Sequence, residues 1–304
     1  MGKRADRCDC LMDASVFILG AGYSGRAIAR ALPDVRQIAG TTRSPAKTGM
    51  LAGIGIDPHL YAGDGFGTET AAALRDVTHL IVSIAPGKGG DPALADLSPD
   101  GRDKLPSLRW IGYLSTVGVY GDHGGAWVDE MSECRPVSER SRQRLEAEKA
   151  WAEFGRTVGV PVAILRLSGI YGPGRNALVN LAKGTAKRIV KQGQVFNRIH
   201  VEDIAGATRH LMREMAGGVF NISDDEPSPP QDVVTYAAEL MGVEPPPEIP
   251  FEEAEMSPMA RSFYGERKRI SNAKLKAAGY CLRFADYRSG LKAMWDSGEW
   301  ENER

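Results

Sequence analysis

Short apolar runs typical of buried strands alternate with helical patterns through the first part of the chain. In chain order, the strand and helix patterns lie at residues 16–20, 25–32, 37–40, 45–51, 69–75 and 79–84. Strands that alternate with helices in this way are typical of a parallel sheet with helices on both faces. The pattern therefore predicts an α/β fold built on a doubly wound parallel sheet.

Two further strand patterns follow at residues 108–114 and 162–167, and a long polar helix pattern at residues 138–157 separates them. Arg and Glu residues recur along this helix pattern at a spacing of four, which stabilises a solvated helix face. Pro136 interrupts any earlier helix, so we expect the helix to begin after it.

Beyond Gly169 the alternation gives way to turns, short strands and two helix patterns. Turn residues gather at 171–175, and the helix patterns cover residues 203–215 and 230–241. We expect a smaller substrate lobe here. Residues 244–250 hold four prolines, which exclude a helix or a central strand and predict a surface connector.

These patterns predict three parts. Residues 1–12 are a polar N-terminal tail, residues 13–170 form a nucleotide-binding domain, and residues 171–304 are mainly the substrate lobe with returning C-terminal elements. The tail lacks the apolar core of a secretory signal, and Met12 is an alternative start to Met1.

Three glycines follow the first strand pattern at the spacing Gly20-x-Gly22-x-x-Gly25, and a helix pattern begins directly after them. This spacing favours a dinucleotide: the first glycine permits a tight turn, the second a close approach to a pyrophosphate, and the third helix packing. The helix N-terminus offers N–H groups to the phosphates. The alternative is a glycine turn with a structural role only.

The end of the second strand pattern bears on the choice of dinucleotide. NAD-binding proteins of this kind carry an acid there for the ribose hydroxyls, whereas this chain has Thr42 and Arg43. Arg43 suits a 2′-phosphate, so the sequence favours NADP over NAD. The alternative is that Arg43 is a solvated loop residue. Asp64 either contacts the adenine or belongs to an ordinary turn.

The composition bears on which kinds of partner the protein binds. The 304 residues include 38 basic and 39 acidic side chains and have a net charge of -1, which gives no case for nucleic acid or an anionic membrane as partner. No apolar stretch reaches the roughly 20 residues of a membrane span. The four cysteines lack the spacing of a disulfide framework or a metal site. We expect a cytoplasmic protein with a small-molecule substrate and no metal.

Three segments resemble the extended short-chain dehydrogenase/reductase family of NAD(P)-dependent epimerases and dehydratases. Residues 114–121 read Leu-Ser-Thr-Val-Gly-Val-Tyr-Gly, residues 165–174 read Leu-Arg-Leu-Ser-Gly-Ile-Tyr-Gly-Pro-Gly, and residues 199–205 read Ile-His-Val-Glu-Asp-Ile-Ala. With the glycine turn, the resemblance covers nearly the whole chain. It implies a Rossmann fold, an NAD(P) cofactor and a possible homodimer.

The chain departs from the family at the residues that carry the chemistry. The family uses a Tyr-x-x-x-Lys pair on the long helix, in which the tyrosine exchanges a proton and the lysine holds the ribose. Alignment on Ala147 and Glu148 puts Arg140 and Arg144 at these places, and residues 138–157 contain no tyrosine. An arginine does not exchange protons at physiological pH. The chain therefore resembles an atypical branch of the family.

A second departure concerns the Asp-Glu pair with which the sugar-nucleotide dehydratases of the family eliminate water. Val117 and Gly118 take those places. The resemblance therefore gives no support to standard 4,6-dehydration.

The residues and the resemblance together give three sets of candidates. The catalytic candidates are Ser115, Tyr120, Arg140 and Arg144. The substrate-binding candidates are Tyr120, Tyr171, Arg175 and His200. The cofactor-binding candidates are Gly20, Gly22, Tyr23, Ser24, Gly25, Thr42, Arg43, Asp64, Ser83, Ala85, Arg144 and Ser168.

Each chemical candidate has a structural alternative. Ser115 could cap a helix, Tyr120 could only pack against a substrate, and His200 could be an interior histidine. Arg140 is either an electrostatic anchor for a carbonyl or carboxylate or part of a solvated helix face. Arg175 either binds an anionic substrate group or lies in an ordinary loop.

The sequence is compatible with two functions. The first is an NAD(P)-dependent oxidoreductase or epimerase for a small carbonyl or nucleotide-sugar-like substrate, in which another group replaces the tyrosine. The second is a catalytically silent NADP-binding regulatory or scaffold protein. The segments around Ser115, Tyr171 and His200 favour the enzyme, because a sensor has no need of a substrate lobe.

Overall fold

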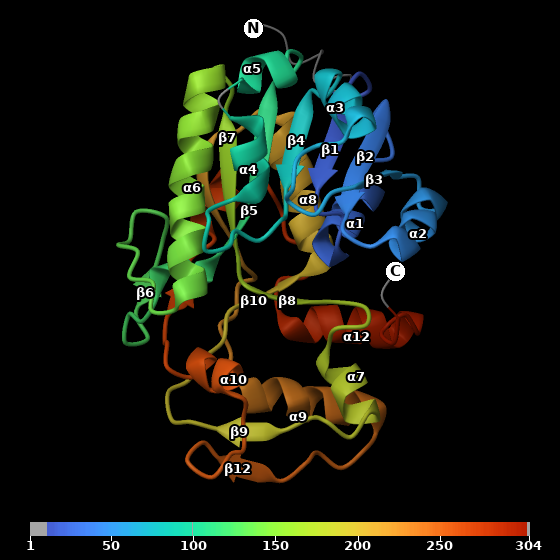
Figure 1. Ribbon diagram of the computed structural model, residues 1–304. Helices are drawn as coiled ribbons and strands as arrows, with labels where there is room; N and C mark the ends of the chain where they lie inside the picture. Colours follow the sequence, from blue (N-terminus) through green and yellow to red (C-terminus); the bar gives the residue numbers. More distant parts are fainter. Residues whose placement is uncertain (1–10, 99, 303–304) are drawn as a thin grey trace, which may run out of the picture. The chain divides into compact units, whose positions relative to one another are not determined.

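The computed structural model describes residues 11–98 and 100–302 (Figure 1). Within it the chain forms two compact units. The first comprises the described residues up to 115 with residues 138–165 and 205–219, and the second comprises residues 116–137 and 166–204 with the described residues from 220 onward. Most of the predicted tail, with Met1, Cys8 and Cys10, lies outside the described residues, and Met12 is exposed.

A seven-stranded sheet confirms the predicted doubly wound fold. Its order is β11-β7-β5-β4-β1-β2-β3, and neighbouring strands from β5 to β3 pair in parallel. The strands are β1 Ser15–Leu19, β2 Gln37–Thr42, β3 Asp57–Leu60, β4 His79–Val82, β5 Trp110–Thr116, β7 Val162–Leu167 and β11 Gly218–Ile222. All residues of β1 and β4 are buried, as expected for central strands covered on both faces.

Helices cover both faces of the sheet in the first unit. They are α1 Tyr23–Arg30, α2 Thr48–Gly53 after the 3-10 turn η1 Pro45–Lys47, α3 Thr68–Arg75, α4 Pro92–Leu97, α5 Gly101–Lys104, α6 Glu139–Val158 and the larger part of α8 Val201–Arg213. Figure 1 shows α3, α4, α5 and α6 on the near face and α1 and α8 on the far face. On the far face, Arg209 of α8 forms an ion pair with Asp34.

The predicted long helix is confirmed as α6. Ser138 caps it by accepting a hydrogen bond from the Ser141 N–H at 3.1 Å, and the helix ends at Gly159, whose φ of 72° is left-handed. Its buried apolar side chains, Ala147, Trp151, Phe154 and Val158, belong to the main core.

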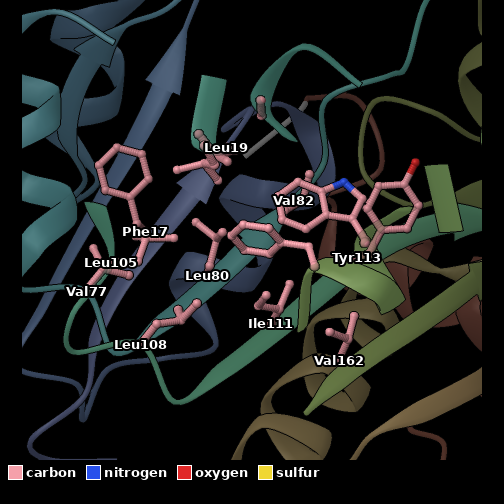
Figure 2. Packing of buried hydrophobic residues seen from close by; sticks show 14 of the residues in the cluster. Phe17, Leu19, Val77, Leu80, Val82, Leu105, Leu108, Ile111, Tyr113 and Val162 are labelled. Atoms are coloured by element: carbon pink, nitrogen blue, oxygen red, sulfur yellow. The ribbon is translucent and has the colours of Figure 1, made fainter. Parts of the chain in front are cut away.

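The main core fills the space between the sheet and the near helices (Figure 2). Phe17, Leu80, Ile111 and Tyr113 point into it from three adjacent strands. Asp91 accepts hydrogen bonds from two N–H groups of α4 and from the Trp151 indole at 3.0 Å. This buried carboxylate therefore fixes α4 and α6 to each other.

Short strands and helices make up the second unit. Its elements are η2 Val117–Tyr120, β6 Trp127–Val128, β8 Gly169–Tyr171, α7 Ala177–Ala182, β9 Arg188–Val190, β10 Arg198–His200, α9 Pro230–Met241, β12 Glu248–Pro250, α10 Pro258–Phe263, β13 Arg269–Ile270, α11 Ala273–Ala277 and α12 Tyr287–Ser297. Parallel two-stranded pairs form between β8 and β10, β9 and β12, and β6 and β13.

Three expectations differ from the structure. The sheet contains β3, whose four residues include Pro58 and give little strand signal, as is usual at a sheet edge. Part of the predicted connector, Glu248–Pro250, forms the short strand β12. The units also do not divide at residue 170, because the segment at 116–137 leaves the first unit and the segment at 205–219 returns to it.

Close packing at Gly155 of α6 generates a stability prediction. A Cβ added there would lie 2.1 Å from Cγ2 of Val162, whereas one added at Gly49 of α2 would meet nothing within 4 Å. Gly155→Ala is therefore expected to lower the free energy of unfolding by about 1–3 kcal/mol. Gly49→Ala, in the same unit, should change it by less than about 1 kcal/mol. Thermal unfolding of both variants checks this, and equal midpoints would contradict it.

Candidate functional site

The glycine turn lies between the end of β1 and the start of α1. Gly20 has a φ of 90°, and a Cβ there would lie 3.2 Å from the Ile84 nitrogen. A Cβ on Gly25 would lie 3.0 Å from the Gly20 carbonyl oxygen and 3.1 Å from Cγ2 of Ile18. Gly20 therefore permits the turn and Gly25 permits the packing of α1 on β1.

Gly22 differs from the other two glycines because nothing lies within 4 Å of the place its Cβ would take. It is exposed, and its backbone is extended, with a φ of -80°. The turn thus leaves open space at the N-terminus of α1, next to Tyr23 and the buried Ser24. This is the place at which a pyrophosphate would approach the backbone, so the residues present fit a dinucleotide.

The end of β2 supports this turn. Thr41 accepts a hydrogen bond from the Gly20 N–H through Oγ1 at 2.8 Å, and its carbonyl accepts one from the Ala21 N–H at 2.8 Å. The next residue, Thr42, is half-buried and caps the Ser44 N–H. Sequence reasoning did not single out Thr41, although a threonine at the next-to-last position of β2 is well placed to bond to the loop that follows β1.

Arg43 is exposed at the carboxyl end of β2, and its side chain makes no hydrogen bond or ion pair within the part of the chain that the structure describes. Asp64 is also exposed, in the loop after β3. Asp96 holds that loop by accepting hydrogen bonds from the Tyr61 hydroxyl at 2.6 Å and the Gly65 N–H at 3.1 Å. Both candidates thus lie in loops at the carboxyl ends of strands.

The end of β4 lies against the glycine turn. The Ser83 N–H donates to the Leu19 carbonyl at 2.8 Å, which places Ser83 and Ile84 directly against Gly20. Ser83 is half-buried and Ala85 is exposed. The glycine turn and this strand end therefore form one continuous edge.

Arg144 reaches this edge from α6. Its Nη1 donates to the carbonyl oxygens of Ile84 at 3.3 Å and Leu114 at 3.0 Å and to the Tyr113 hydroxyl at 3.1 Å. The guanidinium carbon also lies 5.6 Å from the centre of the Tyr113 ring. The residue at the family's lysine position is thus fixed against the ends of β4 and β5.

Arg140, at the family's tyrosine position, is exposed in the first turn of α6. It lies four residues before Arg144, and residues at this spacing share a helix face.

Ser115 is buried at the end of β5, and its hydroxyl donates to Oε1 of Glu148 on α6 at 2.5 Å. The helix-cap alternative does not hold for Ser115, because the cap of η2 is the next residue, Thr116, whose Oγ1 accepts from the Gly118 N–H at 3.1 Å. Thr116 is half-buried. Sequence reasoning used Glu148 only as an alignment marker, although its position one helical turn after Arg144 puts it on the same face.

Tyr120 belongs to the second unit and is fully buried. Its hydroxyl donates to Oδ1 of Asn221 at 2.8 Å, and the Arg166 guanidinium lies 4.8 Å from its ring centre. Burial raises the pKa of Tyr120 to about 12, while Arg166 acts in the opposite direction. Since the hydroxyl is engaged and the side chain is buried inside this unit, the geometry does not favour proton transfer by Tyr120.

Tyr171 and His200 lie side by side in the core of the second unit, with ring centres 5.1 Å apart. Nδ1 of His200 accepts from the Glu202 N–H at 3.2 Å. Burial, and secondarily the charge of Arg283, lowers the pKa of His200 to about 3, so the imidazole is neutral near pH 7. The interior-histidine alternative matches this geometry, and Tyr171 packs against Gly290 of α12.

The remaining two candidates also lie in the second unit. Ser168 is buried after β7, and its N–H donates to the Ile222 carbonyl at 3.0 Å. Arg175 is exposed, and its backbone forms a bridge with Gly172. The candidates are therefore divided between the units: the glycine turn, Arg43, Asp64, Ser83, Ala85, Ser115, Arg140 and Arg144 in the first, and Tyr120, Ser168, Tyr171, Arg175 and His200 in the second.

Known proteins resemble this chain over most of its length. A conserved protein of unknown function from Silicibacter pomeroyi DSS has a solved structure that is 42% identical, with a TM-score of 0.84 over 94% of this chain and 99% of that one. Protein YeeZ of Escherichia coli K12 is 29% identical over 250 residues, which are 76% of this chain and 85% of that protein. The UDP-glucuronic acid 4-epimerase of Bacillus cereus, solved with NAD, shares the fold at 18% identity, with a TM-score of 0.74 over 93% and 95% of the chains.

A parallel sheet with a glycine turn after its first strand defines a nucleotide-binding protein of the Rossmann type. The model of the NAD dependent epimerase/dehydratase family matches residues 108–223. Residues 108–223 are thus similar to this family, and the solved epimerase shares the fold of the chain.

Within residues 11–98 and 100–302, no helix is long and apolar enough to cross a membrane. The same residues hold no group of three His, Cys, Asp or Glu side chains placed to bind a metal ion.

The open space at Gly22 generates a prediction about binding. Gly22→Ala should leave the thermal midpoint unchanged, because the Cβ meets nothing and the backbone is extended. It should weaken NADPH binding by about tenfold or more, because the methyl group occupies the approach of the pyrophosphate. Titration of NADPH fluorescence measures the affinity.

Gly20→Ala is the comparison, since it adds a Cβ against Ile84 in a left-handed turn and should lower the thermal midpoint. Unchanged NADPH affinity in Gly22→Ala would assign the turn a structural role only.

Proposed function

We propose that the protein binds NAD(P) through the glycine turn of its first unit and acts as an oxidoreductase or epimerase on a small carbonyl or nucleotide-sugar-like substrate. The observation that carries the proposal is the edge formed by the glycine turn, the ends of β4 and β5, and Arg144. A bound nicotinamide cofactor would supply or accept a hydride there.

The residues of this edge take distinct roles in the proposal. Gly22 and the N–H groups at the start of α1 receive the pyrophosphate, with Tyr23 and Ser24 beside them. Arg144 orients the nicotinamide ribose in place of the family's lysine, held in position by Ile84 and Leu114.

The preferred cofactor in this proposal is NADP. Arg43 is the residue at the end of β2 that would receive the 2′-phosphate, and its exposed guanidinium is not engaged by any other described group. The cytoplasmic location, the homodimer and the contacts of Tyr171, Arg175 and His200 with a substrate stay predictions.

A second function, an NADP-binding protein without catalysis, has two observations in its favour. Helix α6 has no tyrosine, and the Tyr120 hydroxyl is buried against Asn221. Turnover separates the two functions. The protein is incubated with NADPH and, separately, with NADP⁺ and a panel of carbonyl compounds, alcohols and nucleotide sugars, and absorbance at the nicotinamide band is followed. Micromolar NADPH binding without turnover on the whole panel would favour the silent protein.

Arg43→Ala tests the cofactor preference. Loss of a charge-assisted contact worth about 1.5–3 kcal/mol should weaken NADPH binding by roughly 10- to 100-fold and leave NADH binding within about twofold. Arg36→Ala is the matched control, because Arg36 is an exposed arginine that precedes the opposite end of the same strand. Isothermal titration of both variants with both nucleotides gives the result. Parallel losses for NADPH and NADH would reject the 2′-phosphate assignment.

A further inference from the structure

Arg198 of β10 is held inside the second unit through one nitrogen of its guanidinium. Nη1 donates to the carbonyl oxygens of Phe196 at 3.0 Å and Ser228 at 3.2 Å and to Oγ of Ser228 at 2.7 Å. The guanidinium carbon also lies 5.9 Å from the centre of the Tyr287 ring. These partners belong to the same unit as Arg198, so they hold the guanidinium in one orientation.

The other edge of this guanidinium is not used within the protein. In the part of the chain that the structure describes, Nε and Nη2 of Arg198 make no hydrogen bond and no ion pair. Nε and Nη2 are the two donors that together bind both oxygens of a carboxylate or phosphate. The side chain is half-buried, and an arginine stays charged at physiological pH. A charge in this position with two unused donors is costly unless an anion binds to them.

Asp224 is the acid whose charge acts most strongly on Arg198. Its N–H donates to the Arg198 carbonyl at 2.8 Å, so the two residues are backbone neighbours. Their side chains nevertheless form no ion pair with each other. Asp224 is buried: Oδ1 accepts the Glu226 N–H at 3.3 Å, and Oδ2 has no partner among the described residues. Burial raises the pKa of Asp224 to about 8, although Arg198 acts in the opposite direction. At pH 7 the carboxyl is therefore mostly protonated and does not neutralise Arg198.

The other ionisable groups around Asp224 differ from it in having partners or in being neutral. Burial raises the pKa of Tyr171 and lowers the pKa of His200 to about 3, so neither side chain titrates between pH 7 and pH 9. The three remaining acids are bound by other groups: Asp225 by Lys276 at 2.7 Å, Glu226 by Arg288 at 2.7 Å and Asp286 by the Ser289 N–H at 2.7 Å. Asp224 is thus the group whose charge changes next to Arg198 in this pH range.

We propose that the edge formed by Nε and Nη2 of Arg198 binds an oxyanion of the substrate, a carboxylate or a phosphate, and that the ionised form of Asp224 opposes this binding. This inference rests on the proposed function only in assigning the oxyanion to a substrate. The negative charge of the ionised Asp224 repels a bound anion and attracts the same guanidinium, so the two events oppose each other. The substrate class is therefore an acid that binds more weakly as Asp224 ionises.

The test uses malonate as a carboxylate probe, sulfate as a probe for a phosphate group, and malonamide as the neutral analogue of malonate. The charges of malonate and sulfate do not change between pH 7 and pH 9. The full-length protein is saturated with NADPH and titrated calorimetrically with each probe at pH 7. We expect at least one anion to bind about tenfold or more tightly than malonamide. The anion that binds more tightly distinguishes a substrate carboxylate from a substrate phosphate.

A pH series tests the role of Asp224. Affinity of the wild type for the preferred anion should fall by about tenfold between pH 7 and pH 9, because the pKa of Asp224 is about 8. Asp224→Asn keeps an oxygen for the Glu226 N–H, carries no charge at either pH, and should show no such fall. Asp225→Asn is the matched control: it removes the neighbouring acid, which pairs with Lys276, and should retain the fall.

Variants of Arg198 connect the binding to its guanidinium. Arg198→Gln should weaken the preferred anion by about tenfold or more at pH 7. Arg198→Lys keeps the charge and removes the two-donor edge, so it should weaken the anion by a smaller factor. Arg188→Gln is the matched control, because Arg188 is a half-buried arginine of the same unit that pairs with Glu248 at 2.7 Å. Thermal midpoints identify any loss of folding, and the pH series with Asp224→Asn decides the case if both Arg198 variants are unstable.

The inference fails if neither anion binds, if malonamide binds as tightly as the anions, or if folded Arg198→Gln binds the anion as the wild type does. It also fails if the wild type shows no fall in affinity at pH 9 or if Asp224→Asn shows the same fall. NADPH binding without anion binding rejects the Arg198 site and leaves the proposed function intact. Anion binding by a protein that does not bind NADPH rejects the proposed function and leaves the Arg198 site intact.

Discussion

The close approach of the backbone at Gly20 is the constraint on which the cofactor edge depends. The ends of β1, β2 and β4 meet there: Thr41 bonds to the Gly20 and Ala21 N–H groups, and the backbone of Ile84 lies where a side chain on Gly20 would have to go. Any residue larger than glycine would push these strand ends apart. The start of α1 is fixed by the same contact, because Gly25 packs on the Gly20 carbonyl.

Arg144 connects α6 to the strand ends that surround the glycine turn. Its bonds to Ile84 and Leu114 tie α6 to the ends of β4 and β5, so the helix that bears the family's chemistry is positioned relative to the glycine turn. Buried contacts farther along α6, between Trp151 and Asp91, hold the helix to the same face of the sheet. Helix α6 is thus fixed at two separate places along its length.

Much of this fold was predictable from sequence because strands buried on both faces and helices with caps leave strong local signals. Helix α6 follows from Pro136, the Ser138 cap and Gly159, and α9 from its proline start. Strand β3 was not predictable from sequence, because its pairing with β2 depends on residues elsewhere in the chain and not on the four residues of β3. The close packing at Gly20 and Gly25 was predictable for the same local reason. The partner of Ser115 was not, because it required knowing how α6 packs on β5.

The central claim is that a nicotinamide dinucleotide lies on the edge built around Gly20 and Gly22. Hydrogen–deuterium exchange of the wild-type protein with and without NADPH tests it most directly, because it reports on backbone N–H groups individually. The account predicts that NADPH slows exchange in peptides covering residues 20–26 and 83–86, while peptides from α9 are unchanged. Binding of NADPH with no protection at residues 20–26 would contradict it.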